Sequence, residues 1–309
     1  MRTFKKVLRW TGILLLAVVL GVTAITAARQ NLHYNAPYPA IQSSRDSASI
    51  ARGKHLMLSV AHCTDCHSGP SADSLINAGQ EPVLHGGVAF NLPVGTIYSA
   101  NITSDSTYGI GRYSDAEIAR ALRYGVHPDG TAVYDFMPFH NVTDADLSDI
   151  ISYLRTQKPV AIKKPDNELN LAGKLVKAFL VKPVGPSEPI APSVVPDSTA
   201  AYGKYLVLNV GNCSGCHTKR TLSGEYTGPL LAGGNPMAHG ITPPNLTPDS
   251  TGRLFGWSEE MFVKRFHMGK LNPLSEMPWG SFKRMNDLEL KAIYKYLQTV
   301  PPVRTAEIK

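Results

Sequence analysis

Four cysteines, arranged as two copies of one five-residue pattern, constrain this chain more than any other feature of its sequence. They occur in the segments Cys63-Thr64-Asp65-Cys66-His67 and Cys213-Ser214-Gly215-Cys216-His217. The pattern C-x-x-C-H is typical of c-type haem attachment, because each thiol can form a thioether with one vinyl group of the porphyrin. The histidine that follows then lies below the ring, where its imidazole can bind iron. The sequence therefore predicts two covalently attached haem c groups.

Other uses of a C-x-x-C pair explain less of the sequence. A structural disulfide or a thioredoxin-like redox pair leaves both histidines without a role, and no βαβ pattern surrounds either motif. A zinc site with four cysteine ligands is disfavoured because its C-x-x-C elements usually lie closer in sequence than the 150 residues that separate these two.

The first 30 residues form a separate targeting or anchoring segment. Basic residues precede a run from Trp10 to Ala28 that holds no charge. At 1.5 Å per residue, this helix would span roughly 28 Å, about the hydrocarbon thickness of a bilayer. A cleaved signal peptide is the alternative, because small residues end the run. An uncleaved anchor is favoured, since the apolar run exceeds the usual length of a signal peptide. Either way, the chain after residue 30 is exported.

Net charge does not point to a nucleic-acid partner. The first 30 residues hold five basic and no acidic residues, which leaves 26 basic against 24 acidic residues in the rest. The high isoelectric point therefore owes much to the N-terminal flank, and no nucleic acid is expected to bind.

The two motifs lie inside an internal duplication. Residues 52–69 and 202–219 share a Gly-Lys pair, an apolar stretch and C-x-x-C-H at an offset of 150. Asn101-Ile-Thr matches Asn245-Leu-Thr at an offset of 144, and each half ends in a segment with helical spacing of apolar residues. We therefore expect four regions: residues 1–30, a first domain at 47–160, a proline-rich linker with a short helix at 161–196, and a second domain at 197–305.

Helices dominate the expected structure. Residues 47–62 and 198–212 are predicted to be helices that carry the motifs at their C-terminal ends. Ser114 and Glu117 form a capping box for a helix closed by Gly125, and Ser258 begins its counterpart. The glycine- and proline-rich stretches 68–112 and 218–256 fit loops better than strands.

A second axial ligand for each iron is predicted from the repeat. Met137 and Met277 are each followed by proline, and both lie between the Gly-closed helix and the final helix. A thioether sulfur suits haem iron and raises its reduction potential. The competing residues have no counterpart of the same type in the other half. They are His127 and His140 in the first half, and His239, His267 and Met268 in the second. His55, His62 and His85 are read as ordinary pocket or surface histidines.

Over residues 47–305 the chain resembles the membrane-anchored multihaem c-type cytochromes of bacteria, some of which are electron-transfer subunits of periplasmic dehydrogenases. The shared elements are both C-x-x-C-H motifs, the two Asn segments, the aromatic-Ser helix starts, the Met-Pro pairs and the Tyr-Leu helix ends. The resemblance implies an all-α fold with two tandem cytochrome c-like domains, ligated by His67 and Met137 and by His217 and Met277.

The function expected from these features is electron transfer, without substrate chemistry by protein side chains. The expected partners are a dehydrogenase, an oxidase or another respiratory component. The expected location is the inner membrane, with both haem domains in the periplasm, or the soluble periplasm if the N-terminus is cleaved. The alternatives are a dihaem peroxidase or MauG-like oxidase, which needs an open iron position, and a haem-based sensor.

Overall fold

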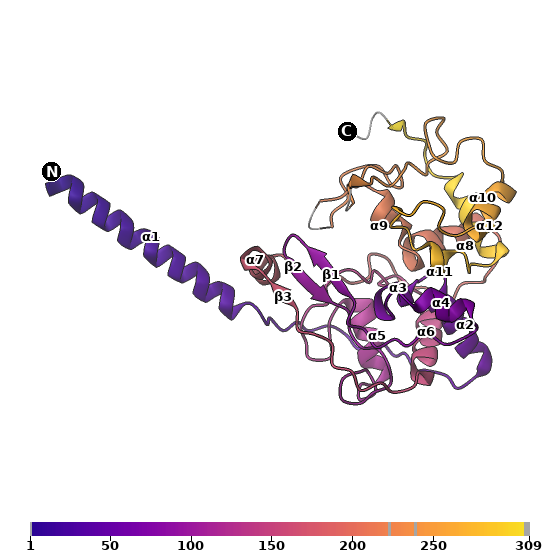
Figure 1. Cartoon of the computed structure of the whole chain (residues 1–309), viewed down its shortest axis with the longest axis horizontal. Helices are drawn as coiled ribbons and strands as arrows, with labels where there is room; N and C mark the ends of the chain where they lie inside the picture. The colour runs from indigo at the N-terminus through magenta and orange to yellow at the C-terminus, as the bar shows by residue number, and fades with distance from the viewer. Residues whose placement is uncertain (1, 222–223, 238–239, 306–309) are drawn as a thin grey trace.

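The computed structural model describes residues 2–221, 224–237 and 240–305. His239, one of the competing ligand candidates, lies outside these residues. Figure 1 shows a long N-terminal helix that projects from a body of two stacked parts. We call residues 31–160 the first half, residues 161–196 the linker and residues 197–305 the second half.

Most of the regular structure is helical. The N-terminal helix is α1 (Arg2–Ala28). The helices of the first half are α2 (Ser47–Leu58), α3 (Cys63–His67), α4 (Ala72–Asn77), α5 (Asp115–Tyr124) and α6 (Asp144–Thr156), and the linker holds α7 (Leu171–Phe179). The second half contains α8 (Ala200–Tyr205), the π-helical segment η1 (Leu206–Val210), α9 (Cys213–His217), α10 (Glu259–His267), α11 (Trp279–Phe282) and α12 (Asp287–Leu297).

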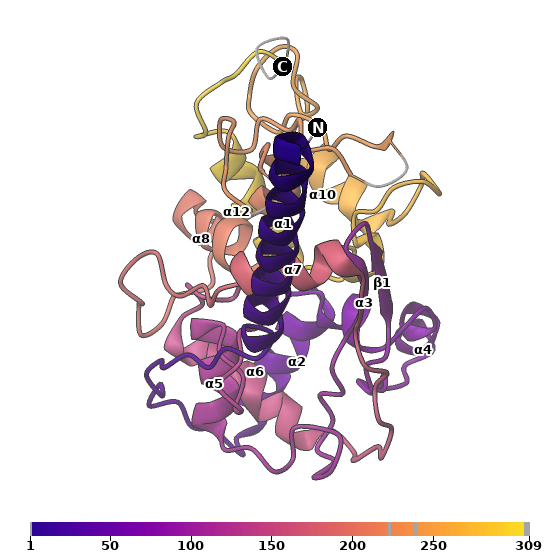
Figure 2. The same cartoon turned by 90° about the vertical axis from the view of Figure 1, so that its left-hand side faces the viewer.

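α1 stands almost wholly exposed, away from the body (Figures 1 and 2). Among the described residues, it is the helix that is long and apolar enough to cross a membrane, with a mean hydropathy of 2.3. The length and composition of α1 therefore agree with an anchor and with a signal peptide.

Helix-capping residues explain where α5 and α10 begin. The Ser114 hydroxyl accepts a hydrogen bond from the Glu117 backbone N–H, and the Glu117 carboxylate accepts one from the Ser114 N–H. This confirms the predicted capping box. Gly125 ends the helix at a φ of 60°, a conformation that glycine adopts without strain. Ser258 caps α10 in the same way through the Met261 N–H.

The helices before the two motifs end earlier than predicted. α2 ends at Leu58, and the first motif forms its own short helix after His62, whose φ is 41°. In the second half the chain passes through η1, and α9 begins after Asn212 at a φ of 47°. A residue in the left-handed region breaks the regular helical backbone, so each motif helix is separate from the helix that precedes it.

A small antiparallel sheet departs from the expected all-α fold. β1 (Ala89–Leu92) and β2 (Gly95–Tyr98) form a hairpin, and β3 (Glu168–Leu169) from the linker pairs with β2 through Gly95–Leu169 and Thr96–Glu168. The stretch 68–112 was predicted to be loop. Its strands are only four residues long, and a partner about 70 residues away adds the third strand.

Each half is built on a close crossing of its first and last long helices. α2 crosses α6 at Gly53, and α8 crosses α12 at Gly203. A Cβ at Gly53 would collide with the Asp149 carbonyl, and one at Gly203 would collide with the Ala292 carbonyl. These glycines occupy matching positions of the duplication, so both halves use one packing solution.

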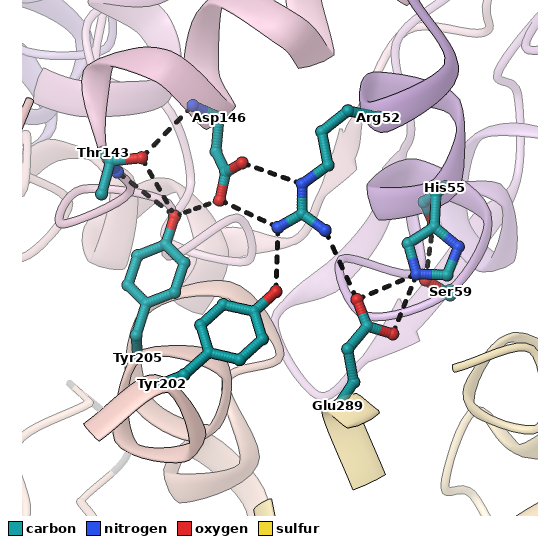
Figure 3. A network of polar contacts seen from close by, with 8 residues as sticks. All are labelled: Arg52, His55, Ser59, Thr143, Asp146, Tyr202, Tyr205 and Glu289. Atoms are coloured by element: carbon teal, nitrogen blue, oxygen red, sulfur yellow. Dashed lines mark hydrogen bonds and ion pairs between the residues drawn. The ribbon is translucent and has the colours of Figure 1, made fainter. Parts of the chain in front are cut away.

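A buried polar network joins the two halves (Figure 3). Arg52 of α2 donates to both oxygens of Asp146, at 3.1 and 3.3 Å, and to the Tyr202 hydroxyl at 3.0 Å. Its third nitrogen lies 3.4 Å from the carboxylate of Glu289, which is fully buried. Arg52 thus binds carboxylates from both halves.

In this network a residue of each half contacts a carboxylate of the other half. Tyr205 donates to the Asp146 carboxylate at 2.7 Å, and His55 Nε2 lies 2.8 Å from the Glu289 carboxylate. His55 and Tyr205 match at the offset of 150, and Asp146 and Glu289 both occupy the third position of their helices. The two halves therefore meet through equivalent surfaces. His55 was read as an ordinary histidine, but here it contacts the opposite half.

Candidate functional site

Both C-x-x-C-H segments fold into the same short helix. In α3 and α9 the two cysteines are half-buried free thiols, and the histidine at the end is buried. One helical turn brings Cys63, Cys66 and His67 close together, and Cys213, Cys216 and His217 are arranged in the same way. The chain thus presents two thiols and one imidazole in each half.

Backbone carbonyls fix the orientation of both imidazoles. The Nδ1 atom of His67 lies 2.8 Å from the Ala100 carbonyl oxygen, and the Nδ1 atom of His217 lies 2.9 Å from the Pro244 carbonyl oxygen. A carbonyl only accepts, so Nδ1 carries the proton and Nε2 keeps its lone pair. This arrangement is typical of metal-binding histidines. Burial also lowers the pKa of both imidazoles, which favours the neutral form that a metal requires.

The residues after these carbonyls hold them in place. Asn101 is buried; its amide donates to the Val160 and Ile162 carbonyls, and its side-chain oxygen accepts from Thr103. Asn245 makes the matching contacts with Val303 and Thr247. The Asn-x-Thr segments of the duplication thus connect the loop whose carbonyl accepts from the motif histidine to the C-terminal end of each half by hydrogen bonds.

A cavity of about 490 Å³ opens beside the first motif. Cys63 and His67 line it together with Met137. Most of its other neighbours are apolar, including Ile102, Leu122 and Phe139. This volume and lining are typical of a cofactor site.

Basic and amide side chains from distant parts of the chain also line this cavity. They are Arg29, Gln30, Lys164, Asn167 and Lys177. A haem carries two carboxylates on an otherwise apolar ring, so an apolar cavity with cationic side chains fits its chemistry. Sequence analysis missed these residues, because nothing in the linker or in the segment after α1 indicates that it lies beside the first motif.

The two Met-Pro segments have the same local structure. The Phe139 N–H donates to the Met137 carbonyl at 2.8 Å, and the Trp279 N–H donates to the Met277 carbonyl at 2.7 Å. Both methionines are partly buried against the core. Met137 shares the cavity with His67, and Met277 packs on the same apolar cluster as Cys213.

Several competing ligands are engaged elsewhere. His140 uses one nitrogen for the Arg123 carbonyl and the other for Asp135, and His267 does the same with the Lys283 carbonyl and Asp287. Met268 is 54% exposed. His127 differs, because it lines the first cavity together with Met137.

The environment of the thiols argues against a redox pair and against zinc. Burial raises the pKa of Cys63 and of Cys213 to about 12, and that of Cys66 to about 11. Zinc binding and thiol–disulfide exchange both need accessible thiolates. Within the described ranges, no group of three or more His, Cys, Asp or Glu side chains is gathered to hold a metal ion.

Comparison with known proteins points to cytochrome c subunits. No family model matches the chain. It is 32% identical over 278 residues to the cytochrome c subunit of an alcohol dehydrogenase (quinone) from Komagataeibacter europaeus, covering 84% of this chain and 57% of that protein. The chain is homologous to cytochrome c subunits of dehydrogenases. The chain spans little more than half the length of these first relatives.

Two other relatives have different lengths. The chain is 28% identical over 306 residues to the gluconate 2-dehydrogenase cytochrome c subunit of Pantoea cypripedii, covering 93% of this chain and 64% of that protein. It is 28% identical over 262 residues to a dihaem c-type cytochrome of Cereibacter sphaeroides, covering 78% of this chain and 82% of that protein. The homology to these proteins supports haem c as the cofactor of this chain.

Proposed function

We propose that this cytochrome carries single electrons from a periplasmic dehydrogenase to the respiratory chain. One observation carries the proposal: each half presents a C-x-x-C-H turn whose imidazole is fixed at Nδ1 by a backbone carbonyl. The relatives named as dehydrogenase subunits support a dehydrogenase as the donor.

The proposed assignment places one haem c in each half. Cys63 and Cys66 hold the first haem and His67 ligates its iron; Met137 is the second ligand. The equivalent residues in the second half are Cys213, Cys216, His217 and Met277. The bound haem supplies one-electron exchange at iron. The chain fixes the imidazole and excludes water with its apolar wall, and the cationic side chains that line the cavity would pair with the haem carboxylates.

The proposed organisation follows the duplication. Residues 47–160 and 197–305 form the two haem domains, and residues 161–196 link them. α1 remains as an uncleaved anchor in the inner membrane, with both halves in the periplasm. The length and hydropathy of α1 support this location.

The experiment that tests the proposal uses the holoprotein made in a host that matures c-type cytochromes. We expect two irons per chain and the absorbance of thioether-linked haem. Both ferric irons should be low-spin and show the near-infrared band of methionine–iron ligation. Met137→Leu and Met277→Leu should each remove about half of that band.

A variant of His127 distinguishes Met137 from His127 as the second iron ligand in the first cavity. His127→Leu should leave the near-infrared band unchanged if Met137 is the ligand. A high-spin ferric haem in the unmodified protein, with rapid turnover of peroxide, would instead indicate a peroxidase and would contradict electron transfer as the sole function.

A further inference from the structure

We propose that α7 is a second membrane contact, lying on the bilayer surface with its apolar face among the lipid headgroups and upper acyl chains. This inference rests on the proposed role of α1 as an anchor. It concerns a different element, and a different measurement tests it.

The first argument is that α7 has its apolar face turned outward. Leu171, Leu175 and Phe179 are spaced four residues apart and so share one face of the helix. Leu171 is 75% exposed and Phe179 is 40% exposed. The helix is buried instead at the small residues Gly173 and Ala178. A helix that packs on a soluble body normally shows the opposite arrangement.

Close backbone packing keeps α7 in this orientation. A Cβ at Gly173 would collide with the Val94 carbonyl in the hairpin turn, so the helix rests on the sheet through its glycine. Asn170 caps its first turn by accepting from the Gly173 N–H at 2.9 Å. The apolar face is therefore held outward by fixed contacts on the other side of the helix.

The second argument is that α7 lies where α1 ends. Arg29 Nε donates to the Ala178 carbonyl at 2.9 Å, and its guanidinium lies 5.3 Å from the centre of the Phe179 ring. Gln30 donates to the Lys174 carbonyl at 2.8 Å. These residues directly follow the uncharged run of α1. If α1 spans a bilayer, α7 is therefore held at the level of the headgroups.

The third argument is the direction of the helix. In Figure 1 α7 is seen nearly end-on, while α1 extends across the view; in Figure 2 α7 runs across α1. A helix that lies across a membrane-spanning helix runs along the bilayer surface. This is the arrangement of an interfacial amphipathic helix.

The charges beside the apolar face favour an anionic lipid surface as the occupant. Lys174 lies on α7 next to Leu171 and Leu175, and Lys182 follows the helix. Lysines near a bilayer extend their amines to the headgroups, and each strengthens binding to anionic lipid. A short helix alone binds weakly, but α1 holds this one at the membrane.

The test measures where α7 lies relative to lipid in the full-length holoprotein. All four native cysteines are assigned to haem, so Leu171→Cys introduces a single free thiol for a nitroxide label. The matched control is Leu288→Cys in α12, where the leucine is 38% exposed; α12 lies on the far side of the body from α1 (Figure 1). The labelled proteins are reconstituted in vesicles of phosphatidylethanolamine and phosphatidylglycerol.

We expect the ratio of collisions with oxygen to collisions with a water-soluble nickel chelate to be several-fold higher at position 171 than at position 288. Equal ratios at the two positions would overturn the inference. Low accessibility of position 171 to both reagents would also overturn it, because a protein surface rather than lipid would then cover the helix.

Flotation with the vesicles and the mass of the N-terminus, measured on the same samples, keep the two proposals separate. Flotation with an intact N-terminus and a water-exposed label at position 171 would leave the anchor in place and exclude the α7 contact. A cleaved N-terminus without flotation would exclude both.

Discussion

Two buried asparagines determine where the histidines of the two C-x-x-C-H motifs point. The Asn101 side chain holds the chain end at residues 160–162 and shapes the loop whose Ala100 carbonyl accepts from His67. Removing a buried group with several hydrogen bonds leaves its former partners unsatisfied, which costs more than the bonds themselves contribute.

We predict that Asn101→Ala lowers the free energy of unfolding by roughly 2–3 kcal/mol, because the buried Thr103 N–H and hydroxyl and the Val160 and Ile162 carbonyls lose a hydrogen-bond partner. Denaturant titration of the holoprotein measures this. Asn245→Ala should have a similar effect. The exposed Asn91→Ala, which loses one hydrogen bond to Thr96, is the control and should change stability little. An unchanged free energy of unfolding in Asn101→Ala would show that the loop does not depend on this side chain.

At the scale of helices, the crossings at Gly53 and Gly203 leave no room for a methyl group. Alanine in place of an unhindered helical glycine usually stabilises a protein by roughly 0.4–1 kcal/mol. Here the obstacle is backbone, which cannot rotate away as a side chain can.

We therefore predict that Gly53→Ala and Gly203→Ala each destabilise the protein by at least about 2 kcal/mol, because α2 or α8 must move off its partner helix. Thermal unfolding of the holoprotein provides the measurement. Gly12→Ala in α1, where nothing approaches the glycine, is the control. A gain in stability at Gly53 would mean that the two helices do not cross closely.

The Arg52 network makes a separate prediction about the interface between α2, α6 and α12. Arg52→Met removes the cation and leaves the carboxylates of Asp146 and Glu289 buried. Breaking a buried ion pair in this way typically costs roughly 3–5 kcal/mol. We expect a loss near the lower end, because the Arg52 side chain is 21% exposed.

The control for this prediction is Arg45→Met, because Arg45 is exposed beside the same helix. Its loss should change the midpoint of denaturation little. If both variants unfolded at the same denaturant concentration, Arg52 would contribute no more than an ordinary surface charge.

The sequence was sufficient for the features that repeat locally. The two motifs, the Ser114 capping box and the final helices were predictable, because each depends on residues a few positions apart. The sheet was not, because β3 reaches β2 from the linker. The Arg52 network was not either, since its partners lie 94, 150 and 237 residues away. The duplication does not indicate the Arg52 network either, because Arg52 aligns with Tyr202, a residue of different chemistry.

At the scale of the whole molecule, the two halves are not independent bodies. Their buried apolar side chains form one continuous cluster that includes Leu147, Ile151, Leu206 and Leu290. A second contact lies beside the first motif: Ser281 donates to Asp65 at 2.6 Å, and the Phe282 ring packs edge-on against His62 at 5.5 Å. The duplication predicts two separable units, but the packing predicts one cooperative unit.

Hydrogen exchange distinguishes these two possibilities. Leu290 in α12 is fully buried, and Leu290→Ala should cost roughly 2–5 kcal/mol. If the halves unfold together, amides of α6 in the first half lose as much protection as amides of α12, because both exchange through the same global opening. Leu288→Ala, on the exposed side of α12, is the control and should leave both helices protected. Loss of protection confined to the second half would show that the shared cluster does not couple the two halves, and that each half opens alone.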